Sequence, residues 1–128
     1  MASFTLLLTR SPFQSSGPAT ALTFAQSALA LGHQINGVFF YLAGVDNANA
    51  LHTPPGDEAN WHDLWTEFHQ KTQVPLHVCV TAAAKRGVIA KEDASQHQVQ
   101  PNLHKPFQAS GLGELIKLIS QSDRVVQL

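Results

Sequence analysis

The order in which short apolar runs and amphipathic segments follow one another constrains this fold most. Four short apolar runs have the length and composition of buried strands: residues 4–9, 34–41, 75–80 and 124–128. Segments with apolar residues at helical spacing lie between them: residues 19–31, 58–72, 81–86 and 111–120. Strands that alternate with helices predict right-handed crossovers and parallel pairing. We therefore expect an α/β fold, with an open, mostly parallel sheet and helices on both faces.

Local signals predict where these elements begin and end. Pro18 suits the first turn of the first helix, and Gly32 suits the position just after its end. Asp57 is the expected N-cap of the helix over residues 58–72. Residues 42–56 are expected to form a long loop, residues 91–97 a helical turn, and residues 98–110 an irregular segment. No linker divides the chain, so residues 1–128 are predicted to form a single domain.

Charge and hydropathy exclude several classes of partner. The formal net charge is −1 and the basic residues are scattered, so we expect no direct binding of nucleic acid. Charged residues make up 13% of the chain, against roughly 25% in a typical domain, which favours contacts with other proteins. No apolar run approaches the ~20 residues that span a membrane, and no signal peptide is expected. One cysteine forms no internal disulfide, and these features together predict a cytoplasmic protein.

Cys79, the only cysteine, lies where a predicted strand meets a predicted helix. Sites in parallel sheets lie beyond the carboxyl ends of the strands, and a helix N-terminus favours the nucleophilic thiolate. Lys85 and Arg86 follow about one turn later and add positive potential, and Thr81 is a candidate helix cap or hydrogen-bond donor to the sulfur. His77 shares the strand face of Cys79, as a candidate base or a buried ring. Cys79 is thus the predicted nucleophile, and an inert buried thiol is the alternative.

Two other patterns are weaker. The loop containing Ser15 and Gly17 follows the first strand, where flavodoxin-like folds bind phosphate, and it makes a small-molecule binder a further hypothesis. That loop lacks the glycine pattern of a phosphate-binding motif, which favours an ordinary loop. His62 and His69 are too loosely spaced to predict a metal site, and the chain contains no HExxH or CxxC motif.

Blocks of residues spread over nearly the whole chain match the pattern of a known family. They are VFFY at 38–41, GVDNAN at 44–49, PLHVCV at 75–80, RG at 86–87, SGLG at 110–113 and DRVV at 123–126. In these blocks the chain resembles the DsrE-like sulfurtransferases, and within that family the TusD-type subunits. The resemblance implies a DsrE-like fold with flavodoxin-like layering and a sulfur relay that needs no cofactor.

The resemblance also implies a role for one residue and a set of partners. Cys79 matches the active cysteine of the family, which takes a sulfane sulfur from a TusA-like donor and holds it as a persulfide. A TusE-like acceptor then carries the sulfur towards 2-thiouridine at the tRNA wobble position. TusB- and TusC-like subunits complete a heterohexamer. Two alternatives stay open, namely a DsrE-type relay in sulfur oxidation and a non-catalytic assembly subunit.

Overall fold

A five-stranded parallel sheet organises the chain, and the computed structural model describes all of residues 1–128. The strands are β1 (Ser3–Leu8), β2 (Gln34–Phe40), β3 (Leu76–Cys79), β4 (Phe107–Ser110) and β5 (Arg124–Gln127), in the order β4-β3-β2-β1-β5. The helices are α1 (Gly17–Ala30), α2 (Trp61–Thr72), α3 (Val80–Lys85), α4 (Lys91–His97), α5 (Leu112–Ser120) and the 3-10 helix η1 (Leu42–Ala48). The expected α/β architecture is confirmed.

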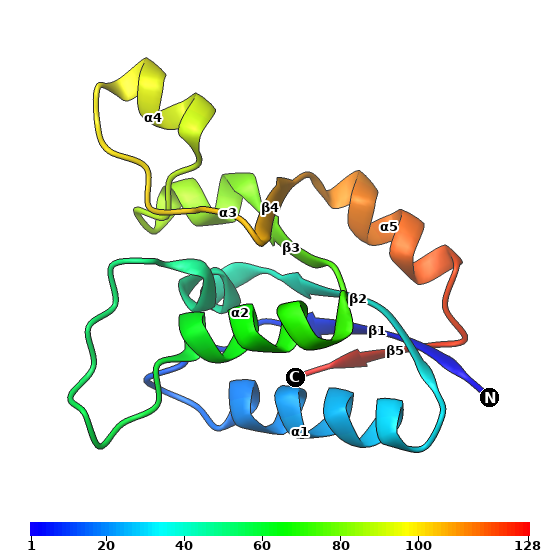
Figure 1. Cartoon of the computed structure of the whole chain (residues 1–128). Helices are drawn as coiled ribbons and strands as arrows, with labels where there is room; N and C mark the ends of the chain where they lie inside the picture. Colours follow the sequence, from blue (N-terminus) through cyan, green and yellow to red (C-terminus); the bar gives the residue numbers. More distant parts are fainter.

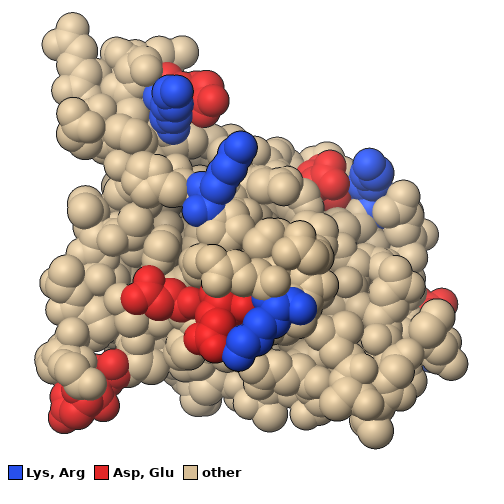
Figure 2. All heavy atoms as spheres, in the orientation of Figure 1, with Lys and Arg blue, Asp and Glu red and all other residues tan.

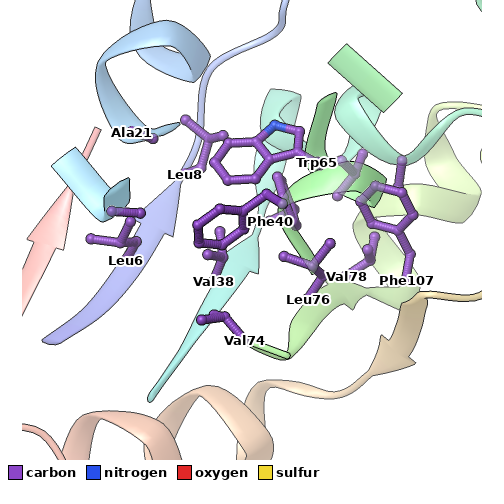
Figure 3. Packing of buried hydrophobic residues seen from close by; sticks show 14 of the residues in the cluster. Leu6, Leu8, Ala21, Val38, Phe40, Trp65, Val74, Leu76, Val78 and Phe107 are labelled. Carbon is purple, nitrogen blue, oxygen red and sulfur yellow. The ribbon is translucent and has the colours of Figure 1, made fainter. Parts of the chain in front are cut away.

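Helices cover both faces of the sheet (Figure 1). Helices α1 and α2 lie on one face and α5 lies on the other, while α3 continues directly from the end of β3 and α4 projects from the body. A large apolar core of 19 buried residues lies on the side of the sheet that α1 and α2 cover, called here the α1–α2 face. Figure 3 shows part of this core, in which the fully buried Trp65 meets the edge of Phe40 at a ring-centroid distance of 5.3 Å. The α5 face has only four buried core residues: Phe39, Cys79, Leu115 and Leu118.

Two segments that were expected to be irregular have regular structure. Residues 107–110 form strand β4, which pairs with β3 from Phe107 opposite Leu76 to Ser110 opposite Cys79. The prediction failed because β4 has four residues and only one of them is buried, so its sequence carries no alternating pattern. Pairing with a neighbouring strand, rather than local preference, makes this segment a strand. Residues 42–48 likewise form η1 within the expected loop.

The ends of two helices test the local signals. Pro18 lies in the first turn of α1, and Gly32 follows its end with φ of +86°, as expected. The prediction for α2 was wrong, because the helix begins at Trp61 and its N-cap is Asn60 rather than Asp57. The Asn60 side chain accepts a hydrogen bond from the backbone N–H of Asp63 at 3.2 Å, which satisfies one free donor of the first turn.

The 3-10 helix η1 fits against the end of β1 because residue 44 is glycine. A Cβ atom at Gly44 would lie 2.0 Å from the carbonyl oxygen of Leu8. The fully buried Asn47 donates to the carbonyl oxygen of Gly44 at 2.9 Å and accepts from Trp65 Nε1 at 3.2 Å. These contacts fix η1, and with it Leu42, at the carboxyl edge of the sheet.

Charged side chains are few and form small separate groups on the face that Figure 2 shows. The face seen therefore carries no broad area of a single charge.

No helix combines the length and the apolar character that crossing a bilayer requires.

A candidate thiol site at the end of strand β3

Cys79 stands at the junction that the sequence predicts. It is the last residue of β3 and the N-cap of α3, so no loop separates the strand from the helix. All four residues of β3 are buried, and Cys79 is 4% exposed. Its side chain packs in the small core of the α5 face, against Phe39 among others.

A pocket of about 700 Å³ opens at this end of β3. The segments that meet at the carboxyl edge of the sheet line it together with Cys79: Tyr41, Leu42, Thr81, Ala82, Lys85, Arg86, Gly111 and Leu112. Cys79 is one of the lining residues, so the pocket offers a reagent or partner a route to the thiol.

Two basic side chains line the same pocket, as the sequence predicts. Lys85 and Arg86 stand at the end of α3, and neither side chain is buried. Arg86 Nη1 lies 3.5 Å from the Asp46 carboxylate, which ties α3 to η1. Positive charge thus lies at the pocket that holds the thiol. Thr81 also lines the pocket, but its expected capping role is wrong because Cys79 itself occupies the N-cap position and no side chain caps this helix.

His77 is buried on the same sheet face as Cys79, also as expected. Its ring stacks on Phe39 at a centroid distance of 6.4 Å, and its Nδ1 lies 2.9 Å from Ser110 Oγ. Its Nε2 lies 3.9 Å from the Glu114 carboxylate. Neither ring nitrogen hydrogen-bonds the sulfur of Cys79, so the geometry does not make His77 the direct base of this thiol.

The buried site shifts the proton affinity of the His77 ring. Burial lowers the pKa of His77 from its ordinary 6.5, the Glu114 carboxylate opposes this effect, and Lys117 adds to it. The ring is therefore neutral over a wider pH range than a free histidine. Sequence reasoning missed Ser110 and Glu114 as neighbours of His77, because β4 had not been recognised and nothing local links positions 77, 110 and 114.

The weaker candidates are engaged in local contacts. Ser15 Oγ accepts a hydrogen bond from the backbone N–H of Gly17 at 3.0 Å, so this loop bonds to itself. His69 Nδ1 lies 2.8 Å from the carbonyl oxygen of Val74, and His62 Nδ1 lies 3.2 Å from Asp63 Oδ1. No three histidine, cysteine, aspartate or glutamate side chains are grouped as metal ligands.

The fold and this site define a class of protein: a parallel α/β protein whose single cysteine ends an interior strand at an open pocket. The model of the DsrE/DsrF-like family matches residues 2–128, and the chain belongs to that family. Within it, the chain is a sulfurtransferase and a homologue of TusD and DsrE proteins.

Named relatives support this placement, and one solved structure shares the fold. The chain is 41% identical over 125 residues to sulfurtransferase TusD of Buchnera aphidicola subsp. Schizaphis graminum, covering 97% of this chain and 98% of the relative. It is 45% identical over 116 residues to a sulfurtransferase TusD homolog of Aliivibrio fischeri, covering 90% and 89%. It is 38% identical over 124 residues to the putative sulfurtransferase DsrE of Allochromatium vinosum, covering 96% and 95%. The ychN protein of E. coli shares the fold over the full length of both chains, with a TM-score of 0.70 at 18% identity.

Proposed function

We propose that Cys79 accepts a sulfane sulfur as a persulfide and hands it to the thiol of a partner protein. The position of Cys79 carries the proposal: it ends β3 at an open pocket, in a chain whose relatives are named sulfurtransferases. It is the only cysteine of the chain. A relay of this kind needs only one cysteine, because the second thiol belongs to the partner.

Two exchange steps account for the transfer. The Cys79 thiolate attacks the outer sulfur of a donor persulfide, the sulfur–sulfur bond of the donor breaks, and the donor leaves as a thiolate that takes up a proton. The thiolate of the acceptor then attacks the outer sulfur of the Cys79 persulfide. That sulfur–sulfur bond breaks, the acceptor keeps the sulfur, and Cys79 returns to the thiolate. The two steps balance without a metal, a cofactor or net oxidation.

The lining of the pocket suits this chemistry. Lys85 and Arg86 offer positive charge to the anionic persulfide and to the leaving thiolate. The first N–H groups of α3 have no partner within the helix and point towards its start, where Cys79 stands. Leu42 and Leu112 supply apolar wall. The low exposure of Cys79 limits its contact with reagents that do not enter the pocket.

The proposal includes a destination for the sulfur. Similarity to TusD-named relatives supports a relay in which a TusA-like donor loads Cys79 and a TusE-like acceptor carries the sulfur towards 2-thiouridine at the tRNA wobble position. TusB- and TusC-like subunits would form the heterohexamer around this chain in the cytoplasm. The sparse and mixed surface charge supports contact with proteins rather than with tRNA. The 38% identity to DsrE of Allochromatium vinosum supports a second candidate, a relay in sulfur oxidation.

Loading with sulfur tests the role of Cys79. The purified chain, treated with a persulfide donor, should gain the mass of one sulfur atom, and a reductant should remove it. Cys79→Ser should gain none while keeping the melting temperature of the wild type. Transferable sulfur on Cys79→Ser would refute the proposal.

A cellular assay separates a catalytic role from an assembly role. Cells that depend on this chain for wobble thiolation should lose 2-thiouridine when it carries Cys79→Ala. Full thiolation with that variant would instead identify a non-catalytic assembly subunit. Normal loading of the purified protein, together with normal thiolation in cells that lack this chain altogether, would instead favour the sulfur-oxidation relay.

A further inference from the structure

One buried ionisable side chain plays no part in the transfer steps. Besides Cys79, His77 is the only buried residue of the chain whose side chain can carry a charge, since the other buried polar residues are Thr5, Ser11, Asn47 and Asn102. Burying an ionisable ring costs free energy unless its polar atoms find partners. The partners of His77 therefore indicate what the ring holds together.

Both partners of His77 belong to the segment that walls the pocket. Ser110, 2.9 Å from Nδ1, is the last residue of β4 and pairs with Cys79 across the sheet. Gly111 and Leu112 follow it directly and line the Cys79 pocket. Gly111 is also the N-cap of α5, whose first turn contains Glu114, 3.9 Å from Nε2. His77 thus contacts Ser110 and Glu114, which precede and follow Gly111 and Leu112 in the sequence.

No other side-chain hydrogen bond joins β3 to this segment. The Ser110 hydroxyl otherwise donates within its own strand, to the carbonyl oxygen of Gln108 at 3.3 Å. It can donate there and still accept from His77 Nδ1, which satisfies both groups. The stacking of the ring on Phe39 fixes its plane. The strand that carries the thiol is thereby tied to the wall over the thiol through one residue.

We infer that His77 is a positioning residue that holds the wall formed by residues 110–112 in place beside Cys79 and so sets how fast the thiol reacts. The part of this inference that concerns sulfur exchange rests on the proposed function. The part that concerns access to the thiol does not, because any thiol reagent enters by the same pocket.

The same geometry makes the wall sensitive to acid. A protonated ring has a hydrogen on both nitrogens, so it donates to Ser110 and also attracts the Glu114 carboxylate. The first turn of α5 is then drawn towards β3, which narrows the pocket. The charged or ionisable groups that face His77 are Glu114 and Lys117 of α5 and Cys79 of β3, whereas Phe39 of β2 and Ser110 of β4 carry no charge.

Three single variants of this chain and one double variant test the tie. His77→Leu and Ser110→Ala each remove it, and His77→Asn keeps a neutral hydrogen-bonding group near the place of Nδ1. The readout is the rate at which iodoacetamide alkylates Cys79, together with the rate of sulfur uptake from a persulfide donor. We expect His77→Leu and Ser110→Ala to change the alkylation rate about five- to tenfold at about pH 8, the effect of one hydrogen bond. His77→Asn should stay within about twofold of the wild type, and the double variant His77→Leu/Ser110→Ala should add nothing further.

The pH profile separates positioning from mere structural support. The ratio of wild-type to His77→Asn alkylation rates should fall on the acid side of pH 6.5, because only the wild-type ring takes up a proton there and draws the first turn of α5 towards β3. A flat ratio, with all variants at wild-type rates, would overturn the inference even if melting temperatures fall. If His77→Leu fails to fold, Ser110→Ala and His77→Asn still decide. Altered alkylation in a chain that takes up no sulfur would refute the proposed function and leave the positioning role standing.

Discussion

The two faces of the sheet differ in what they bury. Strand β3 shows the difference within four residues, because Leu76 and Val78 belong to the large core and Cys79 to the small one, with His77 beside it on the same face. The α1–α2 face has 19 buried core residues and the α5 face has four. A fully buried large apolar side chain stabilises the fold by about 1.5–3 kcal/mol, so the first face contributes most of the stability. Because the first face supplies most of the stability, the second face can hold the Cys79 thiol and the His77 imidazole in place of apolar side chains.

The largest expected effect is a loss of stability that leaves the thiol unaffected. Trp65→Ala removes the largest side chain of the large core and should lower the free energy of unfolding by about 3–5 kcal/mol. The matched change on the other face, Leu115→Ala, should cost about 2 kcal/mol, because Leu115 lies at the edge of a small cluster. Urea unfolding measures both values.

Thiol alkylation should rank the same two variants in the opposite order. Leu115 packs in the cluster that contains Cys79, so Leu115→Ala should change the alkylation rate. Trp65 lies across the sheet and should leave the rate unchanged in the folded protein. Equal effects of the two variants on alkylation would break the division between a stabilising face and a reactive face.

The variant Asn102→Ala tests whether a buried polar side chain away from the reactive face also contributes to stability. Asn102 is buried, accepts from the backbone N–H of Ile89 at 2.6 Å and donates to the Gly87 carbonyl oxygen at 2.9 Å. Asn102→Ala leaves both backbone groups without these partners, so the free energy of unfolding should fall by about 2–3 kcal/mol. Asn36→Ala is the control, because Asn36 loses two side-chain hydrogen bonds, against three for Asn102, but lies where water can replace them. Equal losses in the two variants would contradict the importance of burial here.

The sequence predicts the parts of this fold that carry their own periodicity. Strands β1, β2, β3 and β5 and most of the helical segments were expected, because apolar runs and helical spacing are local properties. The order of the elements was enough to predict parallel pairing. Strand β4 and η1 were missed, because β4 depends on pairing with β3, and η1 depends on the close approach that Gly44 allows to β1.

The candidate site likewise has a part that the sequence predicts and a part that it does not. Cys79, Lys85 and Arg86 are near one another in sequence, and the structure brings them to one pocket as predicted. The wall at Gly111 and Leu112 comes from the chain after β4 and was not predicted. Local signals therefore located the thiol, whereas its surroundings required the pairing of distant strands.

The smallest expected effect is on the pH dependence of stability. Because burial is the main cause that lowers the pKa of His77 below its ordinary 6.5, the unfolded chain binds a proton at this residue at a higher pH than the folded chain does. Well above the ordinary pKa of 6.5 the ring is neutral in both states and contributes no pH dependence. As the pH falls from 6.5 through the lower pKa of the folded state, the protein should lose stability. His77→Asn should lose less over the same range, although His52, whose pKa burial also lowers, keeps part of the acid sensitivity. Urea unfolding of both proteins along the pH range measures the difference, and identical curves would mean that the reactive face adds no acid sensitivity through His77.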